Sequence, residues 1–197
     1  PAHGFYWFRL ARDVEVPSWH EVHLPREDLP LVVMFDGWAS LFRDRVVPWR
    51  IRMAEKTREQ FETEVLPRFM ATQRWYAGKG EPIERAALAD HALWKADGSD
   101  WLLALVDAIS GGVPTRYFMP LSLVWGDGDD SAVRALGPAT IAKVRQQADV
   151  GVLADAIADE SFCRALAVAV GRGGAVKGAS GEIRFSPTDA FARIAGD

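Results

Sequence analysis

The sequence predicts an α+β fold, in which an antiparallel meander sheet of about four strands is covered by a helix and followed by a small helix-plus-hairpin segment. Apolar residues recur with helical spacing before Gln73 and with the two-residue period of strands after Gly80. Asp97-Gly98 and Gly111-Gly112 are hairpin signals between apolar runs. A sheet with one apolar face needs a cover, and the preceding helix is the nearest one. Together these features favour a roll.

The covering helix is expected to begin at Thr57. Gln60 follows three residues later, which is the spacing of a capping box, where each side chain satisfies a backbone N–H at the helix start. Pro67 costs about 3 kcal/mol in a helix interior, so we expect a kink or a break near Glu64. The residues expected to face the sheet are Phe61, Val65, Leu66, Phe69 and Met70.

The strands are predicted from alternation, which is cleanest between Tyr117 and Trp125. We expect Trp94, Trp101 and Trp125 to be core residues rather than platforms for sugars, because large aromatic side chains on strands are mostly buried. The four expected strands are residues 83–95, 101–109, 116–125 and 139–146.

A second helix is expected to begin after Asp159, whose side chain can accept hydrogen bonds from the first helical N–H groups. Gly171 is expected to end it, because glycine tolerates a positive φ. The glycines from 171 to 181 suit a turn or a short hairpin that leads into residues 183–185. The inward face of this helix is expected to carry Phe162, Leu166 and Val170.

The first fifty residues lack the regular helix and strand patterns of the later part of the chain. Residues 4–10 are aromatic and resemble a strand interior, although a lone strand leaves both backbone edges unpaired. Prolines among alternating charges predict that residues 12–50 form mostly an extended, irregular connection. The exception is residues 31–35, which we expect to dock on a hydrophobic surface together with Trp38, Leu41 and Phe42.

Composition excludes several classes of function. A net charge of -4 with scattered basic residues argues against nucleic acid as the main partner. Cys163 is the only cysteine of the 197 residues, which rules out an internal disulfide and favours a reducing, cytoplasmic location. No apolar run approaches the roughly 20 residues of a membrane span. We therefore expect no membrane partner.

The stretch from Gln73 to Gly80 contains the candidate interaction residues. Gly78-Lys79-Gly80 suggests phosphate binding, but a Walker-type loop needs a glycine where Gln73 stands and a serine or threonine where Gly80 stands. A glycine turn between helix and strand is the simplest interpretation. The alternative is a docking or regulatory surface in which Arg74 and Lys79 pair with carboxylates or phosphate from outside while Trp75 packs. The candidate docking residues are Gln73, Arg74, Trp75 and Lys79.

Other sequence features suggest chemistry only weakly. His20 and His23 are flanked by prolines that oppose a metal-binding helix. The acidic run 127–130 lacks the closing glutamate of a calcium loop, and we expect a hairpin tip there. Ser180 lacks the frame of a nucleophile elbow, and Cys163 is expected on or beside the buried face of the second helix. We therefore predict no catalytic, cofactor-binding or metal-binding residue.

Three blocks of sequence resemble a fusion of trehalose synthase with maltokinase. Residues 4–10 look like the closing strand of the trehalose synthase C-terminal β-domain. Residues from about 35 to 80, with Val65-Leu66-Pro67 before Gln73-Arg74-Trp75, resemble the start of the maltokinase N-terminal cap. The third block, residues 117–121, 156–162 and 181–192, looks like the rest of the cap and the approach to the nucleotide-binding lobe.

The resemblance implies a cap without a reaction centre, with a roll like that of cystatin or monellin. The implied parent enzyme phosphorylates maltose with ATP and Mg, and the motifs that bind them are absent from this sequence. The implied partners are downstream kinase lobes and an upstream trehalose synthase domain, with a homo-oligomer possible. The expected units are a closing strand (1–12), a linker (13–54), the cap (55–148) and the start of the kinase intermediate subdomain (149–197).

Two other functions stay open from the residues alone. An independent carbohydrate- or protein-binding module would leave Trp75, Trp94 and Trp125 in an open groove. An oligomerisation arm of trehalose synthase would use residues 1–50 to pair with another copy. The chain starts at Pro1 and stops at Asp197 without obvious terminal structure, so we expect a piece of a longer polypeptide.

Overall fold

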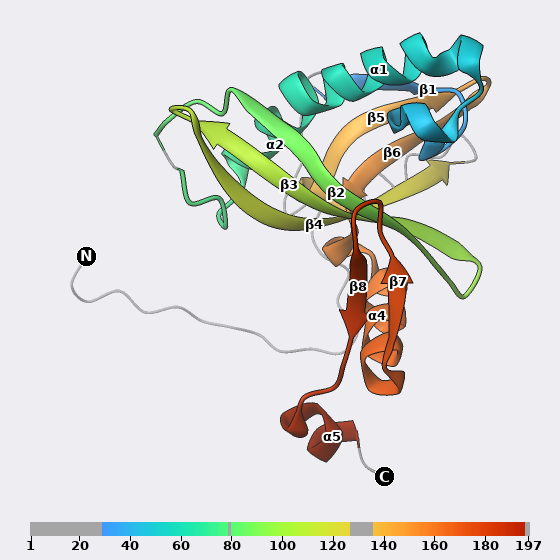
Figure 1. Cartoon of the computed structure of the whole chain (residues 1–197), viewed down its shortest axis with the longest axis vertical. Helices are drawn as coiled ribbons and strands as arrows, with labels where there is room; N and C mark the ends of the chain where they lie inside the picture. Colours follow the sequence, from blue (N-terminus) through green and yellow to red (C-terminus); the bar gives the residue numbers. More distant parts are fainter. Residues whose placement is uncertain (1–28, 79, 127–135, 196–197) are drawn as a thin grey trace, which may run out of the picture.

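The computed structural model describes residues 29–78, 80–126 and 136–195, and it confirms the α+β fold. A six-stranded sheet with the order β1-β5-β6-β4-β3-β2 forms the centre (Figure 1). A helical layer covers one face of it, and a smaller unit of helices and a hairpin lies below the other. The six strands are β1 (Leu31–Met34), β2 (Arg85–Ala96), β3 (Ser99–Ser110), β4 (Val113–Gly126), β5 (Thr140–Gln146) and β6 (Asp149–Asp155).

The predicted meander is confirmed for β2, β3 and β4. Both predicted turns are present and join antiparallel neighbours. Asp97 and Gly98 have φ values of 50° and 82°, and Gly111 and Gly112 have 56° and 74°. Positive φ at both central residues is what a tight two-residue hairpin requires, because that turn matches the twist of the strands.

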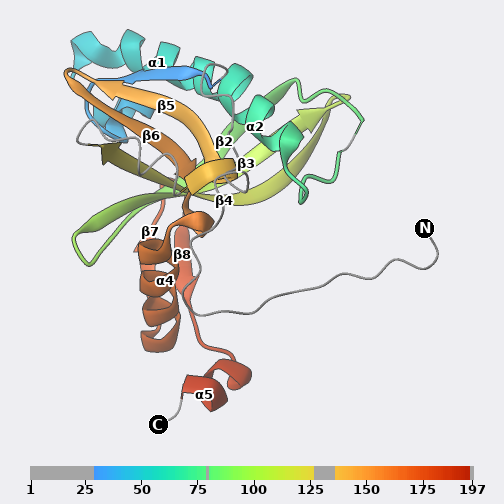
Figure 2. The same ribbon diagram turned by 180° about the vertical axis from the view of Figure 1, so that it is seen from behind.

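The order of the later strands differs from the prediction of four strands in a meander. β6, which was not predicted, lies between β4 and β5 and pairs antiparallel with both. Its turn from β5 has the non-glycine residue Gln147 at φ 55°, so the sequence carries no glycine signal for it. β1 pairs parallel with β5 at the sheet edge, as seen from behind in Figure 2. Val32 and Met34 are buried there, so the predicted docking of this segment is confirmed.

The helical layer runs through α1 (Ile51–Gln60), a π-helical turn (Phe61–Val65) and α2 (Leu66–Thr72). The prediction that the helix begins at Thr57 is wrong, because a 3₁₀ turn starting at Pro48 leads directly into α1. The Thr57 hydroxyl instead donates to the Val33 carbonyl oxygen at 3.5 Å.

The disturbance expected near Glu64 is present as the π turn. Pro67 has no N–H for the carbonyl four residues earlier, and the Leu66 N–H bonds to the Phe61 carbonyl instead. The chain therefore absorbs the proline without ending the helix. The face of this layer toward the sheet is as predicted: Phe61, Val65, Leu66, Phe69 and Met70 are all buried.

A second core lies on the opposite face of the sheet. It joins Trp94 of β2 and Trp101 of β3 to Phe162 of α4 and Phe185 of β8. The helix has its predicted start, because Asp159 accepts hydrogen bonds from the N–H groups of Ser161 and Phe162. The elements of this lower unit are α4 (Glu160–Arg172), β7 (Gly174–Lys177), β8 (Glu182–Phe185) and α5 (Asp189–Ala195).

Three details of this unit differ from expectation. Gly171 lies inside α4, and Gly173, with φ 70°, is the residue that ends it. Cys163 is exposed, and its thiol donates to the Ile157 carbonyl oxygen at 3.3 Å. The short helix α5 was not predicted. The hairpin itself is confirmed as β7 and β8.

The predicted segment boundaries are not tested by the fold alone. The boundary at residue 148 falls in the turn between β5 and β6, and β1 comes from the predicted linker. The expected strand at residues 4–10 lies outside the described residues.

Candidate interaction surface

The Gln73–Gly80 stretch connects the end of α2 to β2. Gln73 is the extended residue that follows α2. Arg74 is exposed, and Trp75 leaves 42% of its surface accessible. Lys79 lies outside the described residues. The structure thus places Gln73, Arg74 and Trp75 together on one connecting segment at the surface.

This segment is fixed by contacts with Tyr117 of β4. The rings of Trp75 and Tyr76 pack on the Tyr117 ring, with centroid distances of 5.5 and 5.7 Å. The Ala77 N–H donates to the Tyr117 hydroxyl at 3.2 Å. Tyr76 is buried, so it anchors the segment while Trp75 stays partly exposed. Trp75 is therefore an aromatic surface held in one orientation.

The glycine after this anchor has a steric role. A Cβ atom on Gly78 would lie 2.5 Å from the Tyr76 hydroxyl oxygen, which is closer than any real Cβ contact. Gly80 has φ +100°, a conformation that side chains disfavour. Both glycines thus suit the interpretation as a turn packed around Tyr76.

The first half of β4 is an edge of the sheet. β3 pairs with β4 from Val113 to Ser122, whereas β6 pairs only with the part from Leu121 onward. Within the described ranges, no strand pairs with the other side of residues 113–120. Pro114 and Pro120 lie in this stretch and lack N–H groups, which limits pairing with a further strand. A partner here is therefore expected to bind side chains rather than add a strand.

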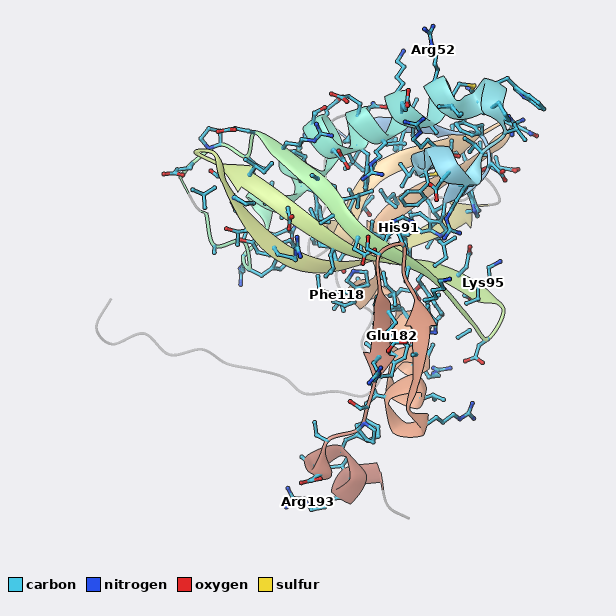
Figure 3. The ribbon with its side chains drawn as sticks, in the orientation of Figure 1. Arg52, His91, Lys95, Phe118, Glu182 and Arg193 are labelled. Atoms are coloured by element: carbon cyan, nitrogen blue, oxygen red, sulfur yellow. The ribbon has the colours of Figure 1, made fainter. Side chains whose placement is uncertain are left out.

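Exposed side chains on this half of β4 lie on both faces of the strand. Phe118 is 50% exposed and lies on the lower face of the sheet (Figure 3). Its neighbour Tyr117 faces the other side, because successive strand residues alternate. Arg116 forms a two-bond ion pair with Asp107, at 2.7 and 2.8 Å, and this pair holds the pKa of the Asp107 carboxyl below its usual value. Trp75 and Phe118 consequently do not form one patch.

The tryptophans do not form one surface either. Trp94 and Trp101 are buried as predicted, and the Trp101 indole N–H donates to Asp159 at 3.0 Å. Trp125 is 41% exposed, so its prediction as a core residue is wrong. Trp125 lies eight residue positions along β4 from Tyr117, which supports Trp75, and this is a span of about 26 Å.

The most strongly coupled charges surround Glu62, which sequence reasoning missed. Its buried carboxylate accepts from Arg58 Nε at 2.9 Å, from Arg85 Nε at 3.0 Å and from the Leu88 N–H at 2.9 Å. Burial raises the pKa of Glu62, but the hydrogen bonds from Arg85, Leu88 and Arg58 outweigh it and hold the pKa below its usual value. The carboxylate is therefore a fixed anion that ties the π turn to β2. The sequence signal that could have indicated this buried site was a glutamate among the apolar positions of the helix.

His91 is the second buried polar side chain of interest. Its ring stacks on Phe42 with a centroid distance of 3.7 Å and an angle of 6°, and its Nε2 atom has no hydrogen-bond partner. Burial lowers the pKa of His91, and the charges of Arg45 and Arg58 lower it further, against weaker opposing effects of Asp44 and Asp90. The neutral ring is thus the form that the fold favours.

The remaining candidates for chemistry divide as follows. His20, His23 and the acidic run 127–130 lie outside the described residues. Ser180 belongs to the turn between β7 and β8, where its N–H donates to Asp90 at 3.0 Å. In the part of the chain that the structure describes, no group of three or more His, Cys, Asp or Glu residues is placed to hold a metal ion. Of the helices described, none has the length and apolar character to span a lipid bilayer.

The central part of this chain matches a known protein family. No curated protein matches the chain. The matching family model begins in α2, includes β2 to β6, and ends at the residue that caps α4. It therefore contains the candidate residues from Gln73 to Lys79 and the edge of β4. Over residues 69–159, the chain matches the maltokinase N-terminal cap domain.

Proposed function

We propose that this chain is the non-catalytic N-terminal cap region of a maltokinase and that its role is structural or regulatory. The observation that carries the proposal is the family match, which extends over five strands of the sheet and ends at the residue that caps α4. The parent reaction would be ATP-dependent phosphorylation of maltose to maltose 1-phosphate, in the metabolism of trehalose and α-glucan.

The proposal leaves the binding of ATP and Mg to other parts of the parent enzyme. The buried carboxylate of Glu62 is already bound by two arginines and a backbone N–H. No cluster of metal-ligating side chains accompanies it among the described residues. We propose that ATP and Mg bind in kinase lobes that follow the cap, and the proposal assigns no step of phosphoryl transfer to this chain.

The connecting segment after α2 is the proposed contact with those kinase lobes. Arg74 is exposed, and Trp75 is braced by Tyr117. A braced aromatic side chain loses little conformational entropy when it binds, and an exposed guanidinium pairs well with carboxylate or phosphate groups. Gln73, Arg74, Trp75 and Lys79 are accordingly proposed as docking or regulatory residues.

The proposal extends to the residues before the cap. By resemblance, residues 1–12 would close an upstream trehalose synthase domain, and residues 13–54 would link it to the kinase. Such a fusion would bring maltose made by the first enzyme close to the second. A cytoplasmic location and a homo-oligomer are further expectations of this arrangement.

The DNA around the coding segment tests the proposed function. We expect the reading frame to continue past Asp197 into kinase lobes with a catalytic aspartate, and to enter Pro1 from a trehalose synthase. A downstream frame without a kinase lobe would contradict the role as a maltokinase cap. An upstream frame without trehalose synthase would contradict the fusion alone.

A carbohydrate-binding module is the second candidate, because Trp75 and Trp125 are both partly exposed. Titration calorimetry of the chain with maltose and trehalose distinguishes the two functions. The cap predicts no saturable heat with either sugar. Saturable binding that is lost in Trp75→Ala or Trp125→Ala, but kept in the Trp49→Ala control on α1's exposed lead-in turn, would favour the binding module.

A further inference from the structure

The edge strand β2 contains a β-bulge at which the two layers of the molecule meet. Leu88 pairs with Val106 and Asp90 pairs with Leu105, so Ala89 is an extra residue between them. A bulge at a sheet edge redirects the strand and the groups beside it. The outward N–H and C=O groups of such an edge also need partners.

The helical layer binds the residue just before the bulge. The Leu88 N–H donates to Glu62, and the Leu88 carbonyl oxygen accepts from the Arg58 guanidinium at 2.8 Å. Glu62 and Arg58 also bind each other, at 2.9 Å. Because Glu62 is almost completely buried, this contact is sheltered from water. The π turn is thereby fixed to one side of the bulge.

The tip of the β7–β8 hairpin binds the two residues just after the bulge. Asp90 Oδ1 accepts from the His91 N–H at 2.7 Å and from the Ser180 N–H at 3.0 Å. The Ala179 N–H donates to the His91 carbonyl oxygen at 2.8 Å. Figure 3 shows His91 at the point where the hairpin tip reaches β2. A Cβ atom on Gly178 would lie 3.2 Å from that oxygen, so the approach is close.

We propose that the β2 bulge is a joint through which the helical layer and the β7–β8 hairpin are coupled. The bulge disappears only if the strand on one side of Ala89 slides by one residue along β3, since pairing changes in steps of one residue. Sliding on one side breaks the Leu88 contacts, and sliding on the other breaks those of Asp90 and His91. The helical layer and the hairpin therefore stabilise the same register of β2 on β3. If either of them is displaced, the bulge can shift and the contacts of the other weaken. This coupling lies within the chain and does not depend on the proposed kinase role.

Amide hydrogen exchange of the 197-residue chain, measured by NMR, tests the coupling. Asp90→Ala removes the acceptor of the Ser180 N–H. Gly178→Ala keeps the carboxylates of Asp90 and Glu62, but its added methyl group crowds the tip of the β7–β8 hairpin. We expect each variant to speed exchange of the Ala179 and Ser180 N–H groups about tenfold or more, and exchange of the Leu88 N–H severalfold. In the reverse direction, Glu62→Gln should speed exchange at Ala179 and Ser180. Rates are compared with amides of the interior strand β3, which removes the effect of global unfolding.

The matched control is Asp149→Ala, which removes an exposed carboxylate beside the β5–β6 turn. It should leave exchange at Leu88 and at the hairpin tip unchanged. If Asp90→Ala and Gly178→Ala speed exchange only at the hairpin and leave Leu88 as in the wild type, the two contacts are independent and the proposal is wrong. Asp90 and Gly178 are only partly buried, so the test with these two variants stands even if Glu62→Gln does not fold.

Discussion

The two faces of the sheet are covered in different ways. The helical layer spreads over one face, with large buried side chains from Phe61 to Met70 and the buried carboxylate of Glu62, which pairs with Arg58 and Arg85. In the part of the chain that the structure describes, the other face is covered where α4 and the hairpin meet Trp94 and Trp101 and where Leu136 packs on β6. Phe118 stays exposed on that face. The helical layer thus packs along its whole face of the sheet, whereas the second face carries a smaller unit and keeps part of the sheet exposed.

The largest effect is expected from Phe61→Ala on the closed face. Phe61 is fully buried where the π turn meets β2, so its loss removes apolar burial and leaves a cavity. The free energy of unfolding should fall by about 3–5 kcal/mol, as measured by urea denaturation. A loss below about 1 kcal/mol would show that this layer is not what closes the sheet.

On the opposite face, Phe162→Ala should act locally. The Phe162 ring meets Trp94 and Trp101 edge-on, with centroid distances of 5.8 and 5.6 Å. Without it, α4 loses its main anchor, so limited proteolysis should cut within residues 160–185 and leave the sheet intact. Simultaneous cleavage of the sheet would mean that the two units unfold as one.

Glu62→Gln should have an intermediate effect. Removing one partner of a buried ion pair usually costs about 3–5 kcal/mol, but Arg58 and Arg85 are partly exposed and can be rehydrated. We expect a loss of about 1–3 kcal/mol in thermal or urea unfolding. Because the pKa of Glu62 lies below 4.5 in the fold, its contribution is complete above pH 4.5 and is lost as pH falls below that value. A variant with unchanged acid sensitivity below pH 4.5 would contradict this assignment.

His91 should make stability depend on pH in a higher range. Its pKa in the fold lies below the ordinary 6.5, so the unfolded chain binds more protons between these values. Stability should therefore be complete above pH 6.5 and decline as pH falls through the pKa of the folded state. His91→Phe keeps a ring against Phe42 and should flatten the change between pH 6.5 and 5, measured as the unfolding midpoint. A slope that persists in this variant would come from other groups, including His3, His20 and His23.

The smallest effect is expected from Phe118→Ala. Half of this side chain is already in water, so stability should change by less than about 1 kcal/mol in the same urea assay. A loss as large as that of Phe61→Ala would show that Phe118 is part of a core. This pair of identical substitutions compares the two faces directly.

Much of the fold follows from local sequence signals, and the rest depends on contacts distant in sequence. Asp97-Gly98, Gly111-Gly112 and Asp159 carry turn and cap chemistry, so the hairpins and the start of α4 could be predicted. β6 could not be, because its turn uses Gln147 at a positive φ. The parallel pairing of β1 with β5 joins residues more than a hundred positions apart and has no local signature.

The same limit applies to the site. The position of Trp75 depends on Tyr117, and Trp125 lies beyond Ser122, where β3 stops pairing with β4. The alternation of apolar residues alone could therefore not predict the exposure of either side chain. The helical face of Phe61 to Met70 was predicted because spacing alone defines it. The contacts of Glu62 with Arg85 and Leu88 arise only when the π turn meets the β2 bulge.

A phosphate-transfer assay tests most directly whether this sheet is a scaffold without a reaction centre of its own. The purified 197-residue chain is incubated with γ-labelled ATP, Mg²⁺ and maltose, and maltose 1-phosphate is separated by chromatography. We predict no labelled sugar phosphate above the rate without protein. Labelled maltose 1-phosphate that increases in proportion to the chain's concentration would contradict the cap assignment.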